Sequence, residues 1–424
     1  MHPKQCSRRW LGVAATLLWG ALAQAGEPLP GAGVESLLAI AKERNPDYGA
    51  MRHEADAALE RVTPAGALPD PKLRTELRDI TRMGEQNATL APSRVGSTRY
   101  LLMQDLPWFG KRDLKREVAE LEAEGARSRA SGAWSDIAAR IKAAHAQRYY
   151  LQRNERLTRE NLELMAQLEQ LSQVRYASGL VPQQDVIRAQ VEQTGLRSEL
   201  VALESEIHHL HTRLNALLAR PTRAPLAEAG QLRPLPAPAS LAGESLEQRL
   251  RSRSPLLAAQ EASVRAAEKS RDLTYKNRYP DFTLGVSPIQ YQSAVREWEL
   301  MLEMNIPLQQ ASRRAQERES EAMLAGARSR QEAAVNQALS DLAENVSALE
   351  AARRTEALVQ DRLLPQAELT FRSALAGYEN GKVDFATLLD AQRQIRLARQ
   401  NQIKAQAEGQ VRLAEIERLL GEDL

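Results

Sequence analysis

The sequence predicts a mainly α-helical chain with a small β part, in which one structural unit occurs twice. A turn motif, Tyr-x-x-Gly-x-Val with Ala-Gln further on, occurs at Tyr176–Gln190 and again at Tyr378–Gln392. No proline interrupts the 64 residues of Asp113–Tyr176, whose apolar positions recur every three or four residues. Short segments that alternate apolar and polar residues precede each long helical stretch. These patterns predict a duplicated fold of long helices and short strands.

Residues 1–25 have the features of a secretory signal. Basic residues precede the apolar run Leu11–Leu18, and Ala23-Gln24-Ala25 matches a small-x-small cleavage site. The apolar run is shorter than the roughly 20 residues that a membrane-spanning helix needs. Cys6, the only cysteine, lies inside this segment. We therefore expect a mature chain without disulfides, thiolate metal sites or an N-terminal cysteine for lipid attachment.

The composition argues against several classes of protein. The chain has 57 Lys and Arg residues against 55 Asp and Glu residues, and three of the basic residues lie in the expected signal. A nearly neutral mature chain predicts no nucleic-acid partner, because such partners normally require a basic surface. The sequence shows no glycine-rich phosphate loop, nucleophile motif or catalytic cluster. We predict neither an enzyme nor a cofactor.

Two repeats and a linker follow the signal, and each repeat is expected to hold a helix, a β-hairpin and a long helical hairpin. The first repeat covers 26–220, with these elements at about 33–62, 70–107 and 113–219. The second covers 244–424, with the elements at about 246–275, 280–307 and 311–422. Five prolines mark the segment between the repeats, 221–243, as an extended linker.

The expected strands have one apolar and one charged face. In Trp298–Ile306, apolar residues alternate with Glu299, Glu303 and Asn305, which is the period of two that a strand requires. A water-filled membrane barrel needs apolar residues outside and polar residues inside, over about 9–11 residues per strand. A half-exposed sheet of a soluble domain explains the strand pattern equally well. In the barrel, Glu299 and Glu303 would line the lumen.

The length of the helices favours the membrane barrel over the sheet of a soluble domain. At 1.5 Å per residue, Asp113–Tyr176 forms a helix of about 96 Å, and helices of this length must pack as coiled coils. The counterpart in the second repeat is expected to kink at Pro365. Four strands cannot close a barrel, and lipid tolerates no open sheet edge, so several chains must share one. We predict that three chains form a 12-stranded transmembrane β-barrel joined to an α-helical coiled-coil barrel.

The duplicated turn and two further segments resemble the outer-membrane efflux (TolC-like) family. One segment is Arg362–Glu368, which leads into Ala376–Phe385, and the other is Leu106–Arg112, where a strand enters a long helix. The resemblance covers nearly the whole mature chain. It implies a homotrimeric channel in the bacterial outer membrane, with helices that extend into the periplasm. It also implies docking on a periplasmic adaptor and on an inner-membrane pump of the resistance-nodulation-division type.

The cargo follows from the branch of the family that the chain resembles. The entry segment Phe109–Arg112 and the short mature length favour the heavy-metal-efflux branch. The resemblance therefore implies a passive conduit for metal cations. A periplasmic adaptor and a structural trimeric coiled-coil stalk are the alternatives. An adaptor would need a lipoyl-like β-domain, and a stalk would not require amphipathic strands at matched positions in both repeats.

The two glycine turns would form the periplasmic tip of the helices. Gly179 and Gly381 each end a long helix, where glycine adopts a left-handed conformation at low cost. A structural role explains both glycines fully. The other motif residues that we assign to the tip turns are Tyr176, Val181 and Val383.

The resemblance implies a gate near this tip. Asp390 matches a position whose carboxylate faces the tunnel constriction, where a ring of three would attract cations; an exposed charge on the outer helix face is the alternative. Asp185 matches a position that helps to latch the closed tip to the tyrosine at Tyr378, with a helix-capping role as an equal competitor. Thr387 stands where relatives can carry a second acid, so the acidic ring is thinner here.

Two groups of potential metal ligands have weaker support. His208, His209 and His211 lie on one helix, but no His-Glu-x-x-His pattern accompanies them, so a surface or structural role is favoured. Met301 and Met304 are soft ligands of the kind that copper prefers, yet they point to opposite faces of the expected strand. We predict no metal site in the chain.

Overall fold

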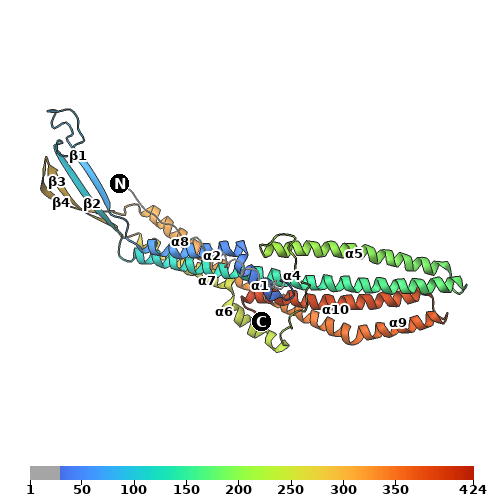
Figure 1. The fold of residues 1–424 in the computed structure, drawn as a ribbon. Helices are drawn as coiled ribbons and strands as arrows, with labels where there is room; N and C mark the ends of the chain where they lie inside the picture. Colours follow the sequence, from blue (N-terminus) through green and yellow to red (C-terminus); the bar gives the residue numbers. More distant parts are fainter. Residues whose placement is uncertain (1–28) are drawn as a thin grey trace, which may run out of the picture.

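The computed structural model describes residues 29–424, so the expected signal lies outside the described residues. The chain is elongated, with one small sheet at one end and long helices that run away from it (Figure 1). This combination of long helices with a single four-stranded antiparallel sheet confirms the predicted fold class.

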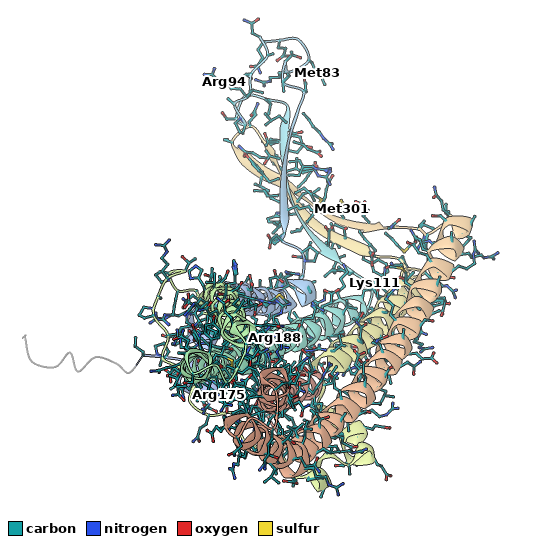
Figure 2. All side chains as sticks on the ribbon, turned by 90° about the vertical axis from the view of Figure 1, so that its right-hand side faces the viewer. Met83, Arg94, Lys111, Arg175, Arg188 and Met301 are labelled. Atoms are coloured by element: carbon teal, nitrogen blue, oxygen red, sulfur yellow. The ribbon has the colours of Figure 1, made fainter. Side chains whose placement is uncertain are left out.

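The sheet is built by both repeats. Its strands are β1 (Lys72–Arg78), β2 (Ser97–Leu106), β3 (Phe282–Tyr291) and β4 (Ala294–Met304). Their order is β1-β2-β3-β4, so the repeats meet between β2 and β3, where Leu102 pairs with Val286. The loop between β1 and β2, which carries Met83 and Arg94, lies at the end farthest from the helices (Figure 2). Within the described residues, β1 and β4 are open edges.

One face of the sheet is apolar and exposed to its surroundings. Leu300, in the middle of β4, is 83% exposed. Its neighbours on this face are also exposed: Leu73, Leu102, Leu284, Val286, Trp298, Leu302 and Met304. A continuous exposed apolar surface of this kind marks contact with a membrane or a partner. No helix in the described part of the chain is both long and apolar enough to cross a membrane.

One uninterrupted helix spans the first repeat from the sheet to the far end. This helix, α4 (Lys111–Ala177), has 67 residues and is about 100 Å long. After a tight turn, α5 (Gln183–Leu217) returns beside it (Figure 1). In the second repeat, α8 (Gln310–Leu358) and α9 (Leu364–Glu379) together follow the course of α4, and α10 (Phe385–Leu420) returns.

A π-helical turn, η2 (Val359–Leu363), separates α8 from α9. Pro365 lies in the first turn of α9, directly after it. Because proline has no N–H and its ring collides with the preceding turn, a regular helix cannot continue through it. A wider turn accommodates the ring. The interruption expected at Pro365 is therefore a π turn just before the proline.

The first helix of each repeat is broken, and the expectation of one continuous helix was wrong. The expected helix at 33–62 is α1 (Val34–Arg44), α2 (Pro46–Glu60) and α3 (Val62–Gly66), and the one at 246–275 is α6 (Gly243–Arg253) and α7 (Pro255–Lys276). The main break in each repeat falls at the residue before a proline, with ψ of 121° at Asn45 and 120° at Ser254. A proline disfavours helical backbone in the residue before it. The expectation of a continuous helix had followed the apolar periodicity and had not taken these prolines into account.

The helices form a layer around α4. Near the sheet, α4 contacts α2 and α7, and toward the far end it contacts α5 and α10. The segment between the repeats, which includes the short 3-10 helix η1 (Pro238–Leu241), crosses the middle of the molecule. Its backbone bonds to the start of the described chain, from Ala227 N–H to the Pro30 carbonyl at 2.9 Å and from Gly230 N–H to the Ala32 carbonyl at 3.0 Å. We call this middle region the waist.

Candidate functional site: the helix tip and the sheet

Two turns of the same construction form the far end of the helices, the tip. Gly179 and Gly381 both have a φ of 70°, a conformation that glycine enters without a Cβ clash. In both turns the N–H after the glycine donates to the carbonyl five positions earlier, at 2.8 Å. This is the Schellman pattern, which satisfies the last carbonyls of a helix. The turn motif therefore encodes the helix ends.

A shared apolar core joins the four helices at the tip. Val181 packs against this core from the first turn. Val383 fills the same position in the second turn and lies so close to Gly377 that an added Cβ would be 2.6 Å from its Cγ2. Tyr176 is 46% exposed. The core itself comes from α4, α5, α9 and α10 and comprises Met165, Leu168, Ala189, Leu196, Ala374, Tyr378, Phe385, Leu388, Leu389 and Ala391.

Tyr378 connects the two helical hairpins. Its side chain is 1% exposed, and its hydroxyl lies 3.0 Å from the Ser172 hydroxyl of α4. The Arg175 guanidinium lies 5.1 Å from the centre of its ring and donates to the Glu379 carbonyl at 2.5 Å. Burial raises the pKa of Tyr378, so the phenol stays neutral. The turn motif indicated Tyr378, whereas Ser172 and Arg175 had no pattern of their own in the sequence.

Asp185 is buried near Tyr378 without a hydrogen bond between them. Its side chain lies in the first turn of α5 and caps no backbone N–H. Burial raises the pKa of Asp185; the Arg188 charge lowers it and the Asp384 charge raises it further. Arg175 and Arg188 both belong to the tip, the end of the helices that faces the viewer in Figure 2. Because the phenol of Tyr378 pairs with Ser172, a direct Asp185–Tyr378 latch is not formed in this state of the tip.

The capping role belongs to Asp384 in the second repeat. Its carboxylate accepts hydrogen bonds from the Thr387 N–H at 3.0 Å and from the Thr387 hydroxyl at 2.5 Å. These bonds hold the pKa of Asp384 below its usual value. The capping role considered for Asp185 was wrong. Asp185 lies inside the first turn of α5 and makes no capping hydrogen bond, whereas Asp384 occupies the N-cap of α10. The spacing Asp384-x-x-Thr387 is a capping signal that the sequence contained.

Asp390 lies on an exposed face of α10. Its side chain is 70% exposed, and a 3.8 Å contact with Arg393 is its only ion pair in the described part of the chain. Thr387, three residues earlier, is exposed on the same face. The intervening Leu388 and Leu389 are buried in the tip core. The face with Asp390 and Thr387 is therefore turned away from the core of its own chain.

Two ion pairs connect α10 to α5 and hence one helical hairpin to the other. Arg393 pairs with Glu192 at 2.6 Å, and Arg396 pairs with Glu199 at 2.7 Å. The Glu192 side chain is only 15% exposed, which limits the screening of its pair by water. Charged helical residues are so common in this sequence that no spacing rule indicated these four.

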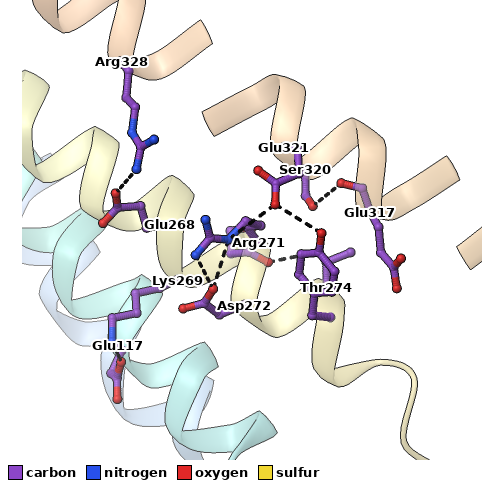
Figure 3. Close-up of polar contacts among 12 residues, drawn as sticks. Glu117, Glu268, Lys269, Arg271, Asp272, Thr274, Glu317, Ser320, Glu321 and Arg328 are labelled. Carbon is purple, nitrogen blue, oxygen red and sulfur yellow. Dashed lines mark hydrogen bonds and ion pairs between the residues drawn. The ribbon is translucent and has the colours of Figure 1, made fainter. Parts of the chain in front are cut away.

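Ion pairs also fix the helix layer between the waist and the sheet (Figure 3). On α7, Lys269 pairs with Glu117 of α4 at 2.7 Å, and the adjacent Glu268 pairs with Arg328 of α8 at 2.6 Å. Two neighbouring residues of α7 thus contact the helices on its two sides. Exposed pairs of this kind add little stability, and here they link α7 to both of its neighbouring helices.

A buried ammonium group joins the helices to the sheet. Lys111, at the start of α4, is 4% exposed, and its Nζ donates to Asp281 Oδ1 at 2.8 Å and to the Tyr279 carbonyl at 3.0 Å. The same carboxylate oxygen accepts the Trp108 N–H at 2.8 Å, and the Trp108 ring stacks on Tyr279 at 5.1 Å. These contacts hold the start of α4 against the segment before β3. The resemblance indicated Lys111 only as part of a motif.

The charged face of the sheet lies opposite the exposed apolar face. Glu299 pairs there with Arg99 at 2.8 Å, and the Arg99 Nε donates to the Ser287 hydroxyl at 3.0 Å. Glu303 lies on the same face and, among the described residues, has no ion pair. The expected alternation of β4 is therefore present, and of the two glutamates expected in the lumen, Glu299 is neutralised by Arg99 of β2.

The histidines belong to the waist. His211 Nε2 accepts a hydrogen bond from Arg148 Nε at 3.0 Å, whereas His208 and His209 are exposed. Arg148 is completely buried, and burial lowers its pKa to about 10. Its guanidinium also donates to the carbonyls of Gly31 and Ala227. Of the three histidines, His211 thus supports the buried Arg148 of α4, which binds the segment between the repeats.

The described residues contain no group of three His, Cys, Asp or Glu side chains that could hold a metal ion. The two methionines are also apart. Met301 contacts Gly285 on the charged face of the sheet, and Met304 is exposed on the apolar face.

Comparison with known proteins identifies the family. The sequence profile described as outer membrane efflux protein matches residues 37–220 and 246–422. The chain belongs to this family. It is therefore an efflux channel of the outer membrane whose long helices lie in the periplasm, and the adaptor alternative is not favoured.

Individual relatives agree with this assignment. The cobalt-zinc-cadmium resistance protein CzcC of Cupriavidus metallidurans is 25% identical over 398 residues, which are 92% of this chain and 90% of that protein. Among solved structures, CusC matches with a TM-score of 0.79 at 17% identity, covering 92% of both chains. VceC of Vibrio cholerae matches with a TM-score of 0.78 at 18% identity, covering 92% of this chain and 96% of that one.

Proposed function

We propose that three copies of this chain form the exit duct of a tripartite efflux system whose cargo is metal cations. The cargo is supported by the similarity over 92% of the chain to a protein named for cobalt, zinc and cadmium resistance. The observation that carries it is the exposed carboxylate of Asp390 on α10, close to the tip and in only a 3.8 Å contact with Arg393. Three such carboxylates around one axis would concentrate cations where the duct narrows.

The number of copies follows from the sheet. Each chain supplies four strands with two open edges, β1 and β4, and its outer face is apolar and exposed. In lipid every strand edge must be paired, so the sheet has to continue into other chains until it closes. Three copies give the twelve strands of the predicted barrel. The helix layers of the same three copies then surround a tunnel in the periplasm.

The tip acts as the gate in this proposal. The tip core and the pairs Arg393–Glu192 and Arg396–Glu199 hold the hairpin α9–α10 against the hairpin α4–α5. Opening requires α10 to move away from α5, which breaks both ion pairs and removes Tyr378 from Ser172. Asp185 and Thr387 lie where this movement would take place, because they belong to the first turns of α5 and α10.

The energy for transport comes from partners. We propose a periplasmic adaptor that contacts the helices and an inner-membrane pump of the resistance-nodulation-division type that delivers the cargo. This chain contributes a passive path, since its sequence carries no phosphate-binding loop for a nucleotide. Contact with the adaptor would supply the free energy that opens the tip.

The cargo can be tested in the bacterium that carries this chain. We expect deletion of the chain to raise the cellular content of zinc, cobalt or cadmium after exposure to these ions, measured by elemental analysis. The native chain should restore the content, and retention of an organic dye such as ethidium should not change. Dye accumulation without metal accumulation would show that the duct serves another class of cargo.

A further inference from the structure

We propose that the two open edges of the sheet are complementary in charge, and that the β1 edge of one copy binds the β4 edge of a second copy through ion pairs on the charged face. The inference rests on the proposed assembly of three copies and specifies how its strands meet. We call the junction between β1 of one copy and β4 of the next the seam.

The β1 edge has more cations than its own chain can neutralise. Arg74 and Arg78 each approach Glu76 at 3.8 Å, and Arg99 of β2 approaches the same carboxylate at 3.9 Å. Three guanidinium groups thus share one carboxylate at distances too long for good hydrogen bonds. The side chains of Arg74 and Arg78 are 61% and 58% exposed. They remain available to a further anion.

The β4 edge has the opposite excess. Glu297, Glu299 and Glu303 alternate along it on the charged face. Glu299 is paired with Arg99 at 2.8 Å. Glu297 accepts only the Tyr291 hydroxyl at 3.1 Å, and neither it nor Glu303 has a cation within ion-pair distance in the described chain. Two carboxylates at this edge therefore have no cation partner in the described chain, whereas two arginines at the other edge share a single carboxylate.

The geometry of the sheet brings these groups together. All neighbouring strands are antiparallel, so β4 of one copy can pair antiparallel with β1 of the next. Side chains alternate between faces with a period of two. A register with Leu73 opposite Leu302 keeps the apolar face continuous. The same register places Arg78 directly opposite Glu297 and Arg74 diagonal to Glu303, within reach of these long side chains.

The same charges exclude other pairings. On the charged face, β1 has three cations (Lys72, Arg74 and Arg78) and one carboxylate (Glu76), so two β1 edges would bring surfaces of net positive charge together. Two β4 edges would bring the glutamates of both copies together. Like charges opposite one another destabilise a strand pair. The head-to-tail arrangement, β1 against β4, joins edges of opposite net charge, and repeated head-to-tail contacts form a ring when the rotation between copies closes. The partner that fits each edge is a second copy of this chain.

The test exchanges the charges at the seam. One variant reverses β1 (Arg74→Glu, Arg78→Glu), a second reverses β4 (Glu297→Arg, Glu303→Arg), and a third carries all four changes. Arg94→Glu, in the loop beyond the sheet, is the control for a change of charge away from the seam. Each protein is purified in detergent, and the assembled fraction is measured by gel mobility with and without heating. Native and four-change chains with different tags are also co-expressed, and mixed assemblies are captured by one tag.

We expect each two-change variant to lose assembled protein about tenfold, because two opposite-charge pairs per seam become like-charge pairs. The four-change variant should recover the native level, since its seams again join opposite charges. When co-expressed with the native chain it should assemble only with itself, because mixed seams join like charges. The Arg94→Glu control should match the native protein.

Other outcomes separate the two proposals. If the two-change variants assemble like the native chain, or if the four-change variant fails to recover, the seam pairing is wrong while the three-copy duct stands. Free mixing of native and four-change chains overturns the seam pairing in the same way. If the native protein itself remains a single chain in detergent and after chemical cross-linking in membranes, the proposed assembly is wrong. The seam pairing, which requires that assembly, is then wrong as well.

Discussion

Arg393 of α10 and Glu192 of α5 form an ion pair of 2.6 Å that connects the two helical hairpins of one chain. The same guanidinium lies 3.8 Å from Asp390, the residue that we place at the constriction. Glu192 therefore holds Arg393 at a distance that leaves the Asp390 carboxylate largely free. In the proposed gate, one arginine would thus couple the contact that closes the tip to the charge that attracts the cargo.

Glu192→Gln is expected to loosen the gate. The change removes a partly exposed ion pair worth about 1 kcal/mol or less, which corresponds to up to roughly a fivefold gain in the open population. It also allows Arg393 to approach Asp390, so cation preference should fall. Both effects can be read from single-channel recordings. Glu368→Gln is the matched control, because it breaks an ion pair with Arg399 at 3.3 Å inside one hairpin; an equal effect of the two changes would contradict the role of Glu192.

The closed tip should become more stable in mild acid. Burial raises the pKa of Asp185, and the Asp384 charge adds to the rise while Arg188 opposes it. The closed tip therefore binds a proton more readily than an open tip, in which Asp185 is hydrated. Its stability rises as the pH falls through the raised pKa and is lost again as the pH increases. Channel openings should thus become rarer as the pH falls from neutral toward the usual carboxyl range.

Two variants check this assignment. Asp185→Asn should abolish the pH dependence and favour the closed tip at neutral pH. Asp384→Asn keeps a capping side chain but removes a neighbouring negative charge, so it should move the transition to lower pH. An unchanged pH profile in Asp185→Asn would assign the dependence to another group.

The duplicated turn and the helix lengths could be predicted because they depend on local signals. Glycines with positive φ end the helices, and an uninterrupted apolar period gives α4 its length. The breaks before Pro46 and Pro255 depend on a local rule too, and the sequence contained it. By contrast, Glu192 and Arg393 are 201 residues apart, and Ser172 and Tyr378 are 206 apart. Which charged or polar residues meet over such distances depends on helix rotation and alignment, which residue spacing does not determine.

Arg148→Gln should destabilise the waist strongly. The buried guanidinium donates to two carbonyls and to His211, and a glutamine cannot reach all three acceptors. Leaving them unpaired costs about 3 kcal/mol. Thermal unfolding and protease sensitivity of the segment between the repeats will measure the loss. Arg156→Gln removes an exposed pair with Glu228 at 2.7 Å and should cost less than about 1 kcal/mol; a similar cost for both would contradict a special role for Arg148.

The joint between the helices and the sheet should depend on Lys111 and Asp281 together. Lys111→Met leaves the Asp281 carboxylate with only the Trp108 N–H, and we expect a loss of about 2 kcal/mol, since Asp281 is partly hydrated. Lys111→Met with Asp281→Asn should recover part of the loss. The melting temperatures of the assembled protein in the two single variants and the double variant give the coupling energy. Additive losses would show that the pair does not act as a unit.

Single-channel recording of the purified protein in a planar bilayer tests the central claim most directly. We expect small, cation-preferring openings that divalent cations block, and we expect Asp390→Ala to lose both the preference and the block. Asp361→Ala, beside the segment between the repeats, should behave like the native channel. Openings whose selectivity and divalent block are the same in Asp390→Ala as in the native protein would remove Asp390 from the constriction and contradict the proposed gate.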